Sequence, residues 1–125
     1  MKALIVDDAK VVRVTLGRIM GQLGYEAVKA EDGQQALEAM AVHPDTDVVM
    51  LDWNMPVMNG YDFLVALREM PEHATHPKVI MVTTETGMPS MLKALAAGAD
   101  EYIMKPFDKD MVAGKLAMVG LEVAG

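Results

Sequence analysis

The chain has 125 residues, of which 52% are hydrophobic, and this is enough to fill the core of one domain of ordinary size. It contains no cysteine, which excludes disulfides, thiolate metal sites and thiol chemistry. The formal net charge of −7 argues against a nucleic-acid or anionic-membrane surface, because both need clustered Lys and Arg. No apolar run has the length of a signal peptide core or a membrane span, so we expect a cytoplasmic protein without membrane contact.

Strand-like and helix-like segments alternate along the chain. Short apolar runs bounded by turn residues predict strands over 3–6, 48–51, 79–82 and 102–104, and a weaker segment of mixed polarity predicts a strand over 25–30. Apolar residues at helical spacing predict a helix after each strand, over 10–23, 33–43, 60–70, 89–98 and 109–123. Strict alternation of this kind predicts an α/β fold, in which a doubly wound, five-stranded parallel sheet is covered by helices on both faces.

Local signals support several of these boundaries. Residues 48–51 are apolar without interruption, which is typical of a central parallel strand buried on both faces. Asp32, Asn59 and Asp108 stand where helix N-caps are expected. In the last helix a single apolar stripe is expected from Val112 through Leu116 and Val119 to Val123. The segment 71–77 is expected to be loop, and the three histidines are expected to be solvated.

Polar residues follow four of the five predicted strands. Asp7 and Asp8 follow the first strand, Asp52 the third, Thr83 the fourth and Lys105 the fifth. Since the carboxyl ends of parallel strands meet at the edge where such sheets bind ligands, we expect these side chains to converge. Three carboxylates at one place must bind a hard divalent cation or raise a carboxylate pKa, and oxygen ligands without His or Cys favour Mg²⁺. An ammonium and a hydroxyl opposite a metal suit the oxygens of a phosphoryl group.

A set of motifs in this order carries a family resemblance: Asp7-Asp8, Asp52-Trp53-Asn54-Met55-Pro56, Met81-Val82-Thr83-Thr84-Glu85, Tyr102 and Lys105-Pro106-Phe107. Together they resemble the receiver domain of two-component response regulators, most closely the single-domain chemotaxis members. The resemblance implies one receiver domain over 1–125 with no output domain. It also implies a flavodoxin-like (βα)5 fold with strand order 2-1-3-4-5, an order that belongs to the family and does not follow from the residues.

The resemblance implies a phosphorylation site at Asp52. This residue would take a phosphoryl group from a histidine kinase or a phosphotransfer protein, so the chain would catalyse its own modification without being an enzyme for another substrate. Asp7, Asp8 and Asp52, together with the backbone carbonyl of Asn54, would bind Mg²⁺. Lys105 and Thr83 would contact the phosphoryl oxygens.

The resemblance also implies a switch. Thr83 would move toward the phosphate and Tyr102 would turn inward, altering a face made of helix 4, strand 5 and helix 5 that binds an output protein. Asn54 and Glu85 resemble the pair that tunes self-dephosphorylation. We expect a monomer, with dimerisation on phosphorylation left open. Methionines gather on the segments of this face, and a core position is expected for Met104 among Met88, Met91, Met104, Met111 and Met118.

Other interpretations remain open from the sequence. Tyr102 is also explained as a packing residue of an edge strand. A haloacid-dehalogenase type phosphatase would need a second Asp where Asn54 stands, and a flavodoxin-like electron carrier would need Gly, Ser and Thr in place of Asp7-Asp8-Ala9-Lys10. A receiver used only as a scaffold is a further alternative. The segment 86–89 lacks the lysines that the chemotaxis protein carries there, which leaves the output partner and the cognate kinase open.

Overall fold

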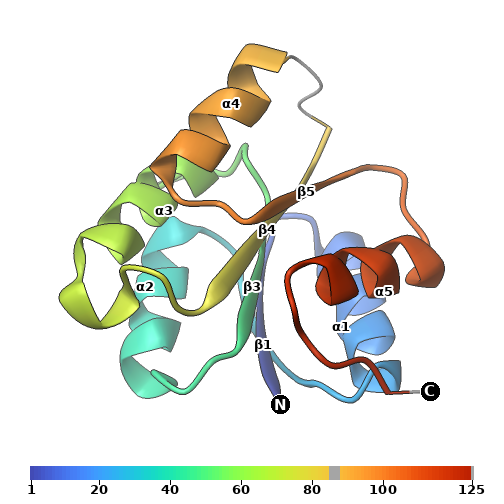
Figure 1. Cartoon of the computed structure of the whole chain (residues 1–125). Helices are drawn as coiled ribbons and strands as arrows, with labels where there is room; N and C mark the ends of the chain where they lie inside the picture. Colours follow the sequence, from blue (N-terminus) through green and yellow to red (C-terminus); the bar gives the residue numbers. More distant parts are fainter. Residues whose placement is uncertain (85–87, 125) are drawn as a thin grey trace.

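The computed structural model describes residues 1–84 and 88–124 of the chain. Within these ranges five parallel strands form one sheet in the order β2-β1-β3-β4-β5 (Figure 1). The strands are β1 Lys2–Val6, β2 Glu26–Ala30, β3 Val48–Leu51, β4 Lys78–Thr83 and β5 Glu101–Met104. The helices are α1 Lys10–Gln22, α2 Gly33–Val42, α3 Gly60–Glu69, α4 Met88–Ala97 and α5 Lys109–Met118. The predicted fold class and strand order are therefore confirmed.

Helices cover both faces of the sheet. Figure 1 shows α2, α3 and α4 on one side, and α1 and α5 on the other. Two separate apolar clusters lie between these helices and the sheet. Along β3, Val49 and Leu51 belong to the cluster on the α2–α4 side, while Val48 and Met50 belong to the cluster on the α1 and α5 side. Because successive side chains of a strand point to opposite faces, this uninterrupted apolar run serves both cores.

The predicted helix caps are present. The side chains of Asp32, Asn59 and Asp108 each accept a hydrogen bond from the backbone N–H three residues later, at 2.8 to 2.9 Å. Each bond satisfies one of the amide groups that a helix leaves unpaired in its first turn. The start of α3 and the start of α5 are thereby fixed next to the carboxyl edge of the sheet.

The last helix is shorter than predicted. Helix α5 ends at Met118, and Gly120 has φ of 83°, a left-handed conformation that glycine adopts at little cost. The amide of Gly120 donates to the carbonyl of Ala117, and the next amide donates to Leu116, which is the pattern of a Schellman cap. The stripe expected to continue to Val123 therefore breaks, although Val123 still packs against the core on the α1 and α5 side.

Two other expectations about the loop 71–77 were wrong. Residues Pro71–His73 form a short 3₁₀ turn, and this turn buries His73, which is 5% exposed. The ring nitrogen Nδ1 of His73 lies 3.0 Å from the carbonyl oxygen of His76, so the buried ring has a hydrogen-bond partner.

Among the described residues, every helix is too short or too polar to cross a membrane.

Candidate active site

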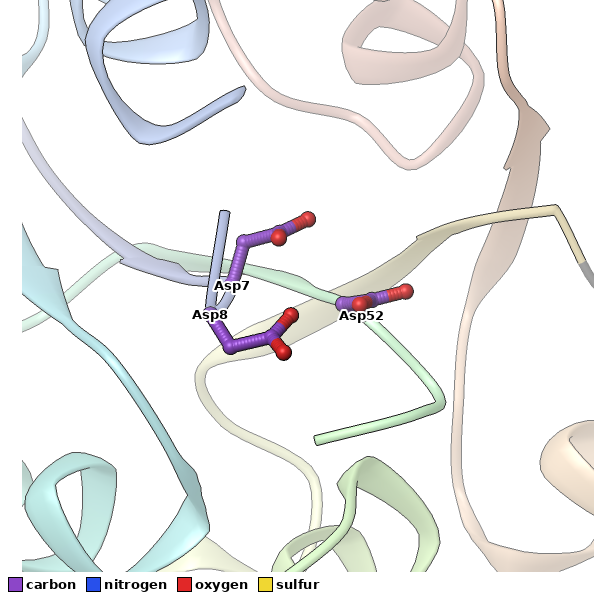
Figure 2. Close-up of side chains that lie close together, drawn as sticks. All are labelled: Asp7, Asp8 and Asp52. Atoms are coloured by element: carbon purple, nitrogen blue, oxygen red, sulfur yellow. The ribbon is translucent and has the colours of Figure 1, made fainter. Parts of the chain in front are cut away.

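The strand ends bring the predicted acidic residues together. Asp7 and Asp8 follow β1, and Asp52 follows β3, its immediate neighbour in the sheet. One carboxylate oxygen from each of the three lies within 4.8 Å of the others. Figure 2 shows the three side chains extending in the same direction from these two strand ends. The predicted acidic cluster at the carboxyl edge of the sheet is therefore present in the structure.

Backbone contacts fix the positions of these residues. Val6 pairs with Leu51 in the ladder between β1 and β3, and the amide of Asp52 donates to the carbonyl of Val6 at 2.9 Å. The first residue of α3, Gly60, donates its amide to the carbonyl of Trp53. A Cβ atom at Gly60 would collide with the backbone carbonyl oxygen of Asp52, so only glycine allows α3 to begin this close to the end of β3.

Asp7 is the most enclosed of the three acids, with 1% of its surface exposed. Its Oδ1 accepts a hydrogen bond from the amide of Ala9 at 2.9 Å, and its Oδ2 accepts one from Nζ of Lys105 at 2.8 Å. The N-cap position of α1 is occupied by Ala9, which has no side-chain cap. Asp7 thus orders the turn that leads into α1 and at the same time anchors Lys105 in the site.

Asp52 is buried, with 7% of its surface exposed, and its carboxylate has several partners. Oδ1 accepts from the amide of Trp53 at 2.9 Å and lies 3.6 Å from Nζ of Lys105. Burial raises the pKa of Asp52, and repulsion from Asp7 raises it further, whereas Lys105, the Trp53 amide and a hydrogen bond from the Thr83 side chain act in the opposite direction. The pKa of this carboxyl group is raised on balance, as expected for a buried acid beside a second acid.

The donor set fits Mg²⁺. All candidate side-chain ligands are carboxylates, and Asp8 is exposed, so that the cluster is reachable from solvent. A divalent cation would relieve the repulsion that raises the pKa of Asp52. Asn54 is an exposed residue of the same loop, and its backbone carbonyl as a further ligand stays a prediction. Glu85, expected to tune dephosphorylation, lies outside the described residues.

The two predicted phosphoryl-binding residues lie at the same edge. Thr83 is the last residue of β4, fully buried, and its carbonyl accepts the amide of Lys105 at 3.1 Å. The ammonium of Lys105 reaches the acidic cluster from the end of β5. The side chains of Asp52, Thr83 and Lys105 are therefore brought together from three neighbouring strands.

Tyr102 lies within β5, the strand that Lys105 follows, and it is buried, with 5% of its surface exposed. It lines a groove of about 440 Å³ between α4, β5 and α5. Four methionines also line this groove: Met91, Met104, Met111 and Met118. The expectation that Met104 is a core residue was wrong, because it is 43% exposed on the edge strand, where no further strand covers it. The side chain of Met88 lies outside the described residues.

Sequence reasoning missed two features around the site. The guanidinium of Arg13, on α1, donates to the backbone carbonyl of Asp7 at 2.7 Å. The centres of the Tyr61 and Trp53 rings lie 5.8 Å apart, and Nζ of Lys93 lies over the Tyr61 ring, 4.2 Å from the centre of that ring. Neither contact has a signal in the spacing of residues, because each depends on how a helix is placed against a neighbouring loop or helix.

Comparison with known proteins agrees with the fold and identifies the family. The model of the response regulator receiver domain family matches residues 3–117. The chemotaxis protein CheY1 of Helicobacter pylori is 41% identical over 120 residues, which cover 95% of this chain and 96% of that protein. The chemotaxis protein CheY of Pseudomonas aeruginosa is 36% identical over 126 residues, covering 100% of both.

Solved structures give the same result. Chemotaxis protein CheY4 of Vibrio cholerae has a TM-score of 0.88 at 33% identity, covering 94% of this chain and 97% of that one. The complex of CheX, CheY, BeF3 and Mg²⁺ from Borrelia burgdorferi contains a chain with a TM-score of 0.90 at 29% identity, covering 98% of this chain and 90% of that one. On the family match and on the identity to near full-length relatives, this chain belongs to the response regulator receiver domain family.

Proposed function

We propose that this protein is a phosphorylation-activated chemotaxis response regulator that accepts a phosphoryl group on Asp52. The observation that carries the proposal is the convergence of three carboxylates with the ammonium of Lys105 at the carboxyl edge of the sheet. The chemotaxis role is supported by relatives that match nearly all of the chain and are named chemotaxis proteins. The donor would be a phosphohistidine of a kinase or phosphotransfer protein in the cytoplasm.

The proposed reaction is a direct displacement at phosphorus. A carboxylate oxygen of Asp52 forms a bond to phosphorus while the bond from phosphorus to the donor imidazole nitrogen breaks, and its electron pair stays on the imidazole. The product is an acyl phosphate on Asp52. Lys105 and the hydroxyl of Thr83 lie beside this carboxylate and would hold the phosphoryl oxygens, in the manner of donors placed where charge develops.

Asp7, Asp8 and Asp52 would hold Mg²⁺, with the backbone carbonyl of Asn54 as a further ligand. When bound, the cation would neutralise the charge that three acids and a phosphoryl group bring to one place. The burial of Asp7 and the exposure of Asp8 support different roles for the two, since only Asp8 faces solvent directly. The similar solved structure from Borrelia burgdorferi, which contains CheY, BeF3 and Mg²⁺, supports this assignment by analogy.

Phosphorylation would be read at the face formed by α4, β5 and α5. Thr83 is linked to β5 by the bond between its carbonyl and the amide of Lys105, and Tyr102 lies in β5 beside the methionine-lined groove. Movement of Thr83 toward the phosphate would therefore shift the wall of the groove. An output protein with an apolar segment is the proposed ligand of this face.

The phosphorylated state is proposed to be short-lived. A water molecule would attack phosphorus, releasing inorganic phosphate and restoring the Asp52 carboxylate, and Asn54 and Glu85 would set the rate. The chain would thus catalyse only the formation and loss of its own phosphate. An acyl phosphate on Asp52 that persists for many hours in purified protein with Mg²⁺ would contradict this part of the proposal.

The test follows the fluorescence of Trp53, the only tryptophan, during titration with Mg²⁺ and then with acetyl phosphate or beryllofluoride. The backbone amide of Trp53 donates a hydrogen bond to the Asp52 carboxylate, so its fluorescence should respond to changes at Asp52. We expect a saturable response to Mg²⁺ and a second response that Asp52→Asn abolishes. If neither response occurs and no phosphoryl label enters the protein, the acidic cluster is inert and the scaffold interpretation takes its place.

A further inference from the structure

We propose that Arg13 is a positioning residue of the phosphorylation site, which fixes the Asp7–Asp8 turn and thereby sets the affinity for Mg²⁺. The inference rests on the proposed function, because it concerns the same acidic cluster. Arg13 is the fourth residue of α1, and its guanidinium turns back toward the carboxyl end of β1. Its side chain is 13% exposed, so the guanidinium is largely enclosed among the surrounding residues.

The contact that carries the inference is short and directed. The Nη1 atom of Arg13 donates to the backbone carbonyl of Asp7 at 2.7 Å. A hydrogen bond from a cation at this distance is among the stronger kinds in proteins. The carbonyl belongs to the peptide unit that joins Asp7 to Asp8, so the bond restrains the dihedral angles on which the direction of the Asp8 side chain depends.

Asp8 depends on this restraint more than Asp7 does. Both carboxylate oxygens of Asp7 have partners, the amide of Ala9 and Nζ of Lys105. Asp8 is exposed, and its position in the cluster follows from the backbone of the turn. The hydrogen bond that restrains the Asp7 carbonyl therefore also restrains the backbone from which the Asp8 carboxylate points toward the other two acids.

A second contact ties Arg13 to the neighbouring loop. Its Nη2 atom lies 3.8 Å from a carboxylate oxygen of Glu31, which follows β2. The side chain of Glu31 is 61% exposed, so this pair adds little energy. Through its two contacts the guanidinium spans from the end of β1 to the residue that follows β2.

If Arg13 acted on the site only through its charge, its removal would change the Mg²⁺ affinity in the opposite direction. Removing a positive charge beside three carboxylates would by itself favour the binding of a cation. A positioning role predicts weaker binding, because outer partners of metal ligands typically contribute about 10- to 100-fold to affinity. The direction of the change in Mg²⁺ affinity therefore separates the two explanations.

The experiment measures Mg²⁺ dissociation constants from Trp53 fluorescence for the wild type, Arg13→Met, Arg13→Lys and Arg18→Met. Methionine keeps the apolar stem of Arg13 and removes the donors. Arg18→Met is the matched control, because Arg18 is exposed on the same helix and its loss changes the net charge equally. We expect the dissociation constant to rise roughly tenfold in Arg13→Met, to rise less in Arg13→Lys and to stay near the wild-type value in Arg18→Met.

A structural role alone would lower the thermal midpoint of Arg13→Met and leave the Mg²⁺ affinity of the folded protein unchanged, so each titration is run well below that midpoint. If Arg13→Met does not fold, Arg13→Leu takes its place with the same expectation, because leucine also removes the donors. An unchanged or tighter dissociation constant in the folded variant overturns the inference. A wild-type protein that does not respond to Mg²⁺ would instead overturn the proposed function.

Discussion

At the residue scale, Asp52 combines features that oppose each other in the resting protein. It is buried beside Asp7, and both conditions raise its pKa, while Lys105 and two hydrogen bonds act to lower it. The charged form needed for attack on phosphorus is thus held at some cost in stability. Such tension is common where a side chain is arranged for reactivity, because a carboxylate surrounded only by favourable partners would be a poor nucleophile.

The raised pKa of Asp52 predicts a pH-dependent gain in stability for Asp52→Asn. The folded protein holds the Asp52 proton more tightly than the unfolded chain does, so stability falls as pH rises through the folded-state pKa of this group and then levels off. Asparagine stays neutral, so the variant should have a higher thermal midpoint than the wild type at pH 7 without Mg²⁺. The difference should shrink as the solution is acidified through that pKa.

Thermal unfolding in the presence of a chelator, at a series of pH values, measures this difference. Comparison of the two proteins at each pH cancels the titration of acids that lie far from Asp52. A variant that is less stable than the wild type at pH 7 would mean that attraction to Lys105 outweighs burial and the repulsion from Asp7.

At the element scale, the sequence predicted the sheet well because four of the five strands are distinct apolar runs, and only the edge strand β2 has mixed polarity. All five expected strands lie within one residue of the observed bounds, and the caps Asp32 and Asn59 are in place. The end of α5 was wrong, since apolar spacing continued past a glycine whose left-handed conformation breaks the helix. Burial of His73 was missed because it depends on a short turn packed against the body of the protein.

Features of the site that depend on packing were likewise not predictable from the sequence. Asp7, Asp8, Asp52, Thr83 and Lys105 were predictable together because parallel strands place their carboxyl ends at one edge. The contact of Arg13 with the Asp7 carbonyl was not predictable, because an arginine near the start of a helix has the same pattern whether it faces solvent or the strand. Contacts from one side chain to a distant backbone atom require coordinates.

The close approach of α3 to β3 predicts contrasting effects for two glycine substitutions. A Cβ at Gly60 would meet the Asp52 carbonyl, so Gly60→Ala should lower the free energy of unfolding by about 1–3 kcal/mol and weaken the response to Mg²⁺. Gly114 lies inside α5, and apart from its chain neighbours and the backbone of its own helix no atom lies within 4 Å of an added Cβ. Gly114→Ala should therefore stabilise the protein by about 0.5–1 kcal/mol.

Urea unfolding of both variants, together with Mg²⁺ titration, measures these effects. Gly114→Ala serves as the matched control, since it makes the same chemical change in a helix away from the acidic cluster. Equal effects of the two substitutions would contradict the assignment of Gly60 as the residue that lets α3 begin against the Asp52 backbone.

At the scale of the whole molecule, a cation held by the ends of β1 and β3 would couple ligand binding to global stability. Binding to the folded state alone adds about 2.7 kcal/mol when Mg²⁺ exceeds its dissociation constant 100-fold. For a domain of this size the thermal midpoint should rise by about 10 °C. Calorimetry with Mg²⁺ measures the rise, with NaCl of equal ionic strength as control, and Asp8→Asn should lose most of it. Equal midpoints in the two salts would contradict Mg²⁺ binding.

The groove between α4, β5 and α5 also makes the protein sensitive to oxidants. A peroxide transfers one oxygen atom to a methionine sulfur, releasing water and leaving a polar sulfoxide. Among the groove methionines the exposed ones should react first, namely Met104, Met111 and Met118, at 43%, 42% and 68% exposure. The buried methionines should react only on unfolding, namely Met20, Met40, Met50 and Met81, all 2% exposed or less.

Peptide mass mapping after brief peroxide treatment measures this order, and the buried methionines serve as controls within the same molecule. Even modification of both sets would contradict it. Three sulfoxides in an apolar groove would turn the proposed output face polar while leaving the acidic cluster unchanged. An oxidised molecule would then still take up phosphate but bind its output protein more weakly, so that oxidative stress would mute the signal without stopping phosphotransfer.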